Sequence, residues 1–212
     1  MMQVEISPSK MKTELHKVKE WRPLWSHEYI RNNYQAFTLL CLYSEIMGEL
    51  SPQADLNDPH LDADEGMEGL FRVLSNAIFH LEARANEKLT DPKSELFIFL
   101  TKLLIEQGLF PIREGCAFCD VELKNLRSIF LIPDHGGFAC NECVGHLDEN
   151  SQHNKREGRE LWELLGSVAN QRYQELKALK IENTEALYGL LHYFNYQFHF
   201  HDKSFKSLRM II

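Results

Sequence analysis

Four cysteines in two C-x2-C pairs constrain this chain more than any other feature. The pairs are Cys116 with Cys119 and Cys140 with Cys143. Two thiolates three residues apart can bind one metal ion from a tight turn, and two such turns complete a tetrahedral sulfur shell around zinc. A closed four-thiolate shell leaves no position for water or substrate, so the pattern predicts a structural zinc site rather than a catalytic one.

Two disulfides are the alternative use of the same four residues. They require an oxidising compartment, and residues 1–19 contain no apolar stretch typical of a secretory signal. We therefore expect a cytoplasmic protein with reduced thiols. His146 is an alternative ligand, but with four cysteines available we expect it to lie in solvent. Cys41 lies in an apolar run and is expected to be a small buried hydrophobe.

Composition favours a globular protein and argues against two classes of partner. The chain has 212 residues, 44% of them hydrophobic, and no apolar run long enough to cross a membrane. Its net charge of −8 opposes strong nonspecific DNA binding. Residues 32–71 contain no Lys or Arg. One acidic surface is one interpretation of this bias, and ordinary solvated faces are the other.

Apolar residues at helical spacing predict a mainly α fold, a helical bundle with an inserted zinc-ribbon-like segment. We expect an arm over residues 1–25 with at most one short strand, and a helical domain over residues 26–212. The zinc segment is expected at about residues 111–146, with a strand over Ile129–Ile132 and a turn at Gly136. The expected helices cover residues 26 to about 48, 65–83, 92 to about 107, 158–179, and 183 or 184 onward.

Particular residues mark the ends and the buried faces of these helices. Asp91 and Pro92 predict a helix start, and Gly108 predicts its end. The apolar stripe expected in the first helix is Ile30, Phe37, Cys41 and Ser44, and that in the second is Met67, Leu70, Phe71, Leu74, Ile78 and Leu81.

Three stretches of the chain resemble the C-terminal part of the RecO family of bacterial recombination-repair proteins. The first runs from Leu96-Phe97 through Gly108 and Pro111 into Cys116-Ala117-Phe118-Cys119. The second is Gly136-Gly137-Phe138-Ala139-Cys140-Asn141-Glu142-Cys143, and the third is Lys206-Ser207-Leu208-Arg209. The resemblance covers about residues 26–212.

The resemblance implies zinc, a helical domain, and a role on single-stranded DNA with RecR and single-strand-binding protein. Family members begin with an OB-fold barrel, which binds single strands. We expect no barrel here, because residues 1–25 leave no room for five strands. DNA contact is then expected from basic residues: Lys203, Lys206 and Arg209 near the end, and Lys155, Arg156 and Arg159 after the second cysteine pair. A solvated tail is the alternative.

The last helix contains many aromatic residues, which either stack on bases or form core. Core packing is the favoured interpretation for Tyr188, Tyr193, Phe194, Tyr196, Phe198 and Phe200. No catalytic motif is recognisable in the sequence. Two hypotheses follow: a non-enzymatic recombination mediator that binds single-stranded DNA and partner proteins, or a zinc-stabilised scaffold that binds only protein.

Overall fold

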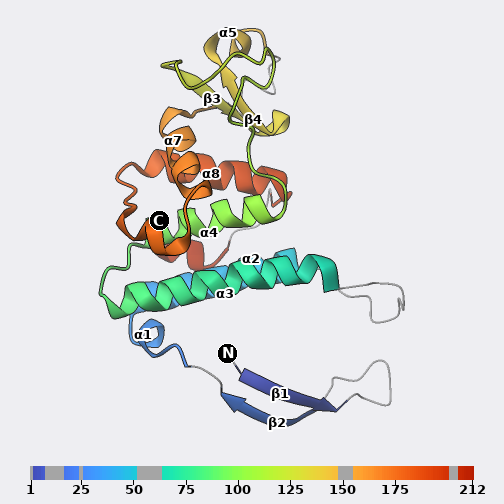
Figure 1. Cartoon of the computed structure of the whole chain (residues 1–212), viewed down its shortest axis with the longest axis vertical. Helices are drawn as coiled ribbons and strands as arrows, with labels where there is room; N and C mark the ends of the chain where they lie inside the picture. The colour runs from blue at the N-terminus through green and yellow to red at the C-terminus, as the bar shows by residue number, and fades with distance from the viewer. Residues whose placement is uncertain (1, 8–16, 24–25, 52–63, 148–154, 201–204) are drawn as a thin grey trace.

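The fold is mainly helical, as the sequence predicts, and a small β-containing segment forms one end of it (Figure 1). The computed structural model describes residues 2–7, 17–23, 26–51, 64–147, 155–200 and 205–212. Its elements are β1 (Met2–Ser7), β2 (Lys17–Pro23), α1 (Glu28–Arg31), α2 (Tyr34–Leu50), α3 (Asp64–Asn86), α4 (Pro92–Glu106), β3 (Ile129–Ile132), η1 (Pro133–His135), β4 (Gly137–Cys140), α5 (Asn141–Val144), β5 (Arg156–Glu157), α7 (Arg159–Ala169), η2 (Tyr173–Ala178), α8 (Thr184–Gln197) and η3 (Ser207–Met210).

Helix α4 is the centre of the fold. It begins at Pro92 after the N-cap Asp91, and Gly108 follows it with a φ of 68°, so both predicted ends are confirmed. Its buried residues occupy all sides of the helix, including Leu96, Phe97 and Leu100. Because α4 contacts α2, α3, α7 and α8, these helices share one core.

The helix expected from Ser26 to about Gly48 is two helices, so that prediction is wrong. Helix α1 ends at Arg31, and α2 begins at Tyr34. The side chain of Asn33 accepts a hydrogen bond from the Ala36 N–H at 3.0 Å and so caps α2. A short amide side chain competes with the helical backbone in this way, and the pair Asn32-Asn33 therefore starts a new helix rather than continuing the old one.

The predicted buried stripes of the first two helices are only partly correct. In α2 the stripe turns outward: Phe37 is 48% exposed, Cys41 is only half-buried, and Ser44 is exposed. The core face is instead formed by Ala36, Leu39, Leu42, Tyr43, Ile46 and Met47. In α3, Leu70 and Leu81 are buried as expected, whereas Phe71 is exposed. Apolar residues on both faces of α2 make its periodicity ambiguous, and only contact with α4 decides which face is inside.

The helix expected over residues 158–179 ends early, and the chain continues as a 3₁₀ helix. Helix α7 stops at Ala169, and η2 begins at Tyr173. Asn170 donates from Nδ2 to the Gly166 carbonyl at 3.0 Å. The Lys102 amine donates to the carbonyls of Val168 and Gln171, at 2.8 Å each. These donors satisfy carbonyls that a longer helix would have used, so the chain can turn here. The start of α8 at Asn183 is confirmed, since its side chain accepts from the Glu185 N–H at 3.0 Å.

The N-terminal arm contains two strands rather than at most one. Strands β1 and β2 pair antiparallel, with Met2 opposite Pro23 and Val4 opposite Trp21. The register shifts between Glu5 and Ile6, and this irregularity interrupts the alternation that would have revealed the second strand.

The segment between α4 and α7 contains a three-stranded sheet in the order β4-β3-β5. The predicted strand Ile129–Ile132 is confirmed as β3, and it pairs antiparallel with β4 and β5. Gly136, at a φ of 64°, completes the predicted turn between β3 and β4. In the described ranges, no helix combines the length and apolar character needed to cross a bilayer.

Candidate metal centre

The first cysteine pair lies in a tight turn closed by the backbone. The Asp120 N–H donates to the Cys116 carbonyl at 3.0 Å, and the Cys116 N–H donates to the Val121 carbonyl at 2.9 Å. Asp120 adopts a φ of 58°, which Asp tolerates better than most residues. The turn therefore presents Cys116 and Cys119 toward the same point.

The second pair is brought to the same place by β4 and α5. Strand β4 ends at Cys140, and α5 contains Cys143. The first turn is held against β4, because the Ala117 N–H donates to the Phe138 carbonyl at 2.9 Å. A hairpin between the two pairs, as the sequence predicts, is what folds residue 140 back onto residue 116.

The four sulfur atoms form a group that could hold a metal ion. All four Sγ atoms lie within 4.8 Å of one another. The Sγ atoms of Cys119 and Cys140 are 3.8 Å apart, which matches the sulfur–sulfur edge of about 3.8 Å expected for a tetrahedron with zinc–sulfur bonds of about 2.3 Å. All five cysteines of the chain are free, so the disulfide alternative has no support. His146 is exposed and lies outside the sulfur group.

The polar surroundings of the site favour bound thiolate at Cys116. Burial of this sulfur opposes its ionisation, but backbone N–H groups outweigh that effect and lower the pKa of Cys116 to about 7. One of these donors is the Cys140 N–H, 3.3 Å from Sγ. Hydrogen bonding to the sulfur of Cys119, together with burial, raises the pKa of Cys143. Four adjacent thiolates repel one another, so a divalent cation is the natural means of keeping all four deprotonated.

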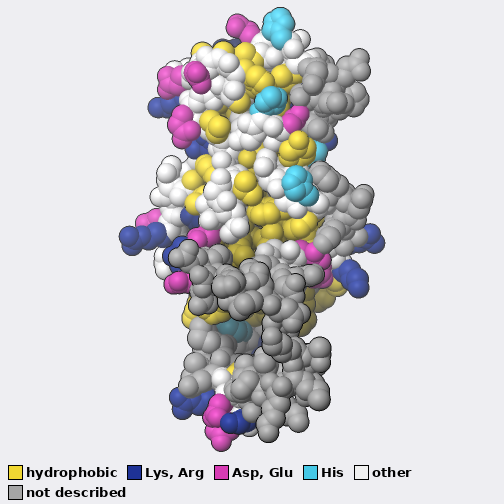
Figure 2. Space-filling view, turned by 90° about the vertical axis from the view of Figure 1, so that its right-hand side faces the viewer, with side chains coloured by type: hydrophobic (Ala, Val, Ile, Leu, Met, Phe, Trp, Pro, Cys, Tyr) yellow, Lys and Arg dark blue, Asp and Glu magenta, His cyan; other side chains and the backbone are white. Residues whose placement is uncertain are grey.

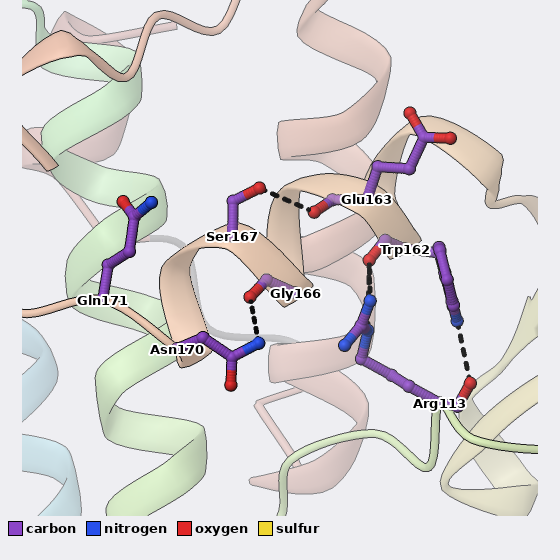
Figure 3. Close-up of a pocket in the computed structure, with 7 residues that line it drawn as sticks. All are labelled: Arg113, Trp162, Glu163, Gly166, Ser167, Asn170 and Gln171. Carbon is purple, nitrogen blue, oxygen red and sulfur yellow. Dashed lines mark hydrogen bonds between the residues drawn. The ribbon is translucent and has the colours of Figure 1, made fainter. Parts of the chain in front are cut away.

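Arg113 and Trp162 join the metal segment to α7 (Figure 3). The Arg113 guanidinium donates to the Trp162 carbonyl at 2.7 Å from Nη2 and 3.1 Å from Nε, and the Trp162 indole N–H donates back to the Arg113 carbonyl at 2.9 Å. The guanidinium also lies over the indole ring, 4.4 Å from its centroid. Figure 3 shows this side chain reaching α7 between Trp162 and Gly166, where an added Cβ would require the guanidinium to move.

Comparison with known proteins gives a family. The family model described as "Recombination protein O C terminal" matches residues 56–209, well over half of the chain. The chain belongs to the RecO family. The "DNA repair protein RecO" of Caldicellulosiruptor saccharolyticus is 30% identical over 109 residues, which are 51% of this chain and 39% of that relative. The match therefore spans less than half of the relative's length. No solved structure matches the chain.

The terminal RecO-like motif has a tertiary anchor that the sequence did not reveal. Residues Lys206 to Arg209 enter η3, which packs on α2. The Glu45 carboxylate of α2 accepts hydrogen bonds from the Ser207 hydroxyl at 2.8 Å and from the Ser207 N–H at 3.3 Å. Glu45 is 162 residues away in sequence, so no local pattern could have identified it.

Five of the six basic residues predicted to contact DNA are described, and their surroundings differ. Lys206, the N-cap of η3, and Arg209 within η3 are exposed, whereas Lys203 falls outside the described residues. Lys155 and Arg156 precede α7, and the Lys155 amine lies 5.7 Å from the centre of the Phe130 ring.

Arg159 has a structural role in this RecO family member. Its Nη1 donates to the carbonyls of Leu123, Lys124 and Leu126 at 3.3, 3.1 and 2.9 Å. Its Nε donates to Glu163 at 2.8 Å. The same contacts bring two further exposed cations, Lys124 and Arg127, close to the start of α7. Their position depends on tertiary contacts, and sequence reasoning missed them.

The aromatic residues around α8 mostly form core, as the favoured interpretation predicts. Tyr193, Phe194 and Phe200 are buried, and Phe198 packs against them. Tyr188 is 48% exposed and Tyr196 is only half-buried, so these two are exceptions.

Proposed function

We propose that this RecO family member is a non-enzymatic mediator of DNA repair and recombination, stabilised by zinc and able to bind single-stranded DNA, partner proteins, or both. The observation that supports this most is the match of the family model over residues 56–209. By resemblance, the expected partners are RecR-like and single-strand-binding proteins. A cytoplasmic location, which keeps thiols reduced, is part of the proposal.

Zinc is proposed as the ion bound by Cys116, Cys119, Cys140 and Cys143. The sulfur-only donor set and the 3.8 Å separation of two Sγ atoms support it. The role proposed for the ion is structural: it fixes the two turns that carry the cysteines and the hairpin between them. No catalytic step is assigned to it.

DNA contact is proposed at two separate basic groups. Lys203, Lys206 and Arg209 form the first, and Lys155 and Arg156, with Arg159 behind them, form the second. Three phosphate contacts to a single strand correspond to a log–log salt slope of roughly −2. Because the net charge is −8, binding is expected to be weak and to be lost at moderate salt.

A titration with labelled single-stranded DNA at low and moderate salt tests this proposal. We expect Lys203→Glu/Lys206→Glu/Arg209→Glu to abolish the low-salt binding of the parent. A matched control reverses three exposed cations elsewhere, Arg31→Glu/Lys88→Glu/Lys180→Glu, which changes net charge equally. Equal losses in the two triple variants would show a net-charge effect only and would move the DNA site elsewhere.

A protein-binding scaffold without DNA affinity is the second candidate function, favoured by the acidic net charge. If the parent protein binds no single-stranded DNA even at low salt, the scaffold function is favoured over the DNA-binding one. A measured interaction with purified RecR-like or single-strand-binding protein would then be required.

A further inference from the structure

The metal segment carries several exposed apolar side chains. We call Ile112, Phe118, Val121 and His135 the metal tip. Ile112 is 52% exposed, Phe118 39% and Val121 42%, and His135 is also exposed. Figure 2 shows hydrophobic side chains reaching the surface at this end of the molecule, with acidic side chains beside them. Exposed apolar side chains that lie together are a candidate binding surface.

The members of the metal tip are held together by the turns that carry the cysteines. The Ile112 N–H donates to the Gly136 carbonyl at 2.9 Å, next to His135. The rings of Phe118 and His135 lie 4.5 Å apart. Val121 accepts the Cys116 N–H, so it belongs to the same turn as Phe118. Phe118 and His135 are therefore in direct contact, and backbone hydrogen bonds hold Ile112 and Val121 in the same turns.

The exposed charges nearest the metal tip in sequence are mainly negative, whereas Arg156 lies on β5, at the opposite edge of the sheet from β4. Residues 112–147 contain five Asp and Glu against three Lys and Arg. Arg113, one of the three cations, is turned onto Trp162 of α7. A divalent ion bound by four thiolates adds a formal charge of −2 to the site. The exposed carboxylates close to the cysteines in sequence are Glu114, Asp120, Glu122 and Glu142.

We propose that the metal tip docks a protein segment in which an apolar side chain is flanked by Lys and Arg. The apolar side chain packs on Phe118, Ile112 and Val121, and the cations meet the surrounding carboxylates. A nucleic acid strand carries the wrong charge for this surface, and a second copy of the chain would bring like charges together. The inference deepens the proposed function by naming the chemistry of a partner, and it rests on the proposed metal site.

Selection of short random peptides on the zinc-loaded protein tests the proposal. We expect the selected peptides to have a net positive charge and an aromatic or large aliphatic residue. Phe118→Ser is expected to weaken their binding by at least about tenfold, as for removal of a central interface residue. Glu122→Lys is expected to weaken it several-fold at low salt and less at high salt.

Two variants on α3 serve as matched controls. Phe71→Ser removes an aromatic ring that is 60% exposed, more than Phe118, and Glu68→Lys reverses an exposed charge. Both are expected to bind the peptides like the parent. Any of four results would overturn the proposal. The selected peptides could be acidic or neutral, or none could be selected. Phe118→Ser could bind them unchanged, or oligothymidine could displace them.

Metal content and single-strand affinity are measured on the same samples. If the parent protein contains zinc and binds single-stranded DNA but selects no cationic peptide, only the proposal that the metal tip docks a cationic segment is overturned. Parent protein without zinc overturns the metal part of the proposed function, and the peptide selection still decides between a cationic and another partner.

Discussion

The buried carboxylate of Glu95 is predicted to make Arg84 one of the most sensitive positions of the fold. The Arg84 Nε lies 3.1 Å from Glu95 Oε1, and the exposed fractions of the two side chains are 6% and 3%. The His80 Nε2 lies 3.2 Å from the other carboxylate oxygen but lacks hydrogen-bond alignment. The pair joins α3 to α4, so it lies at the centre of the helical body.

Arg84→Met is the informative perturbation. It keeps most of the side-chain volume and leaves the Glu95 carboxylate buried without its cation. Breaking a buried pair in this way costs about 3–5 kcal/mol. Replacing both partners, as in Arg84→Met/Glu95→Met, is expected to cost far less, because neither member of the pair is then left buried without the other. The central prediction is that the double variant is more stable than Arg84→Met.

An exposed pair in the same helices provides the control. Arg72 and Glu106 are 2.9 Å apart, but 64% of the Arg72 side chain is exposed. Arg72→Met is therefore expected to cost far less than Arg84→Met. Urea unfolding followed by circular dichroism, at one fixed zinc concentration, measures all four proteins. A loss below about 1 kcal/mol for Arg84→Met, or a double variant no more stable than Arg84→Met, would refute the reasoning.

Three further predictions concern the metal, the joint with α7 and alkaline pH. Elemental analysis of protein purified under reducing conditions without chelator is expected to find one zinc ion per chain. Cys116→Ser should lower both the zinc content and the Tm, because metal binding contributes to folding. A parent protein without metal would contradict this. Gly166→Ala is expected to shift tryptophan emission, because the added Cβ displaces the Arg113 guanidinium from the Trp162 carbonyl. The free energy of unfolding is expected to change by less than about 1 kcal/mol, since Ala favours the helix over Gly and offsets the lost contact. Unchanged tryptophan emission would count against that joint. Burial raises the pKa of Tyr193 above the ordinary value of about 10. Its contribution to stability is therefore intact below a pH of about 10 and is lost as the pH rises further. Urea unfolding of Tyr193→Phe should show a shallower loss of stability at alkaline pH than the parent, and an equally steep loss would contradict this.

Local signals sufficed for much of the fold and for the sulfur site. Cap residues act within one helical turn, which is why Pro92 and Asn183 identified helix starts correctly. The C-x2-C spacing places two cysteines within a single turn. The strand Ile129–Ile132, followed by the turn at Gly136, predicted a hairpin between the two pairs. The four ligand candidates followed from these short-range constraints.

Features that depend on distant partners were decided only by the tertiary structure. The buried face of α2 was ambiguous until α4 packed against it, and the end of α7 depends on the Lys102 amine, more than sixty residues earlier in the chain. Arg159 looks like a free cation in the sequence, yet its guanidinium donates to carbonyls 33–36 residues away. Sequence patterns report which groups a residue carries and which neighbours lie within a turn or two. Whether a charged side chain faces solvent or a backbone carbonyl depends on which distant segments pack together, and only the tertiary structure shows this.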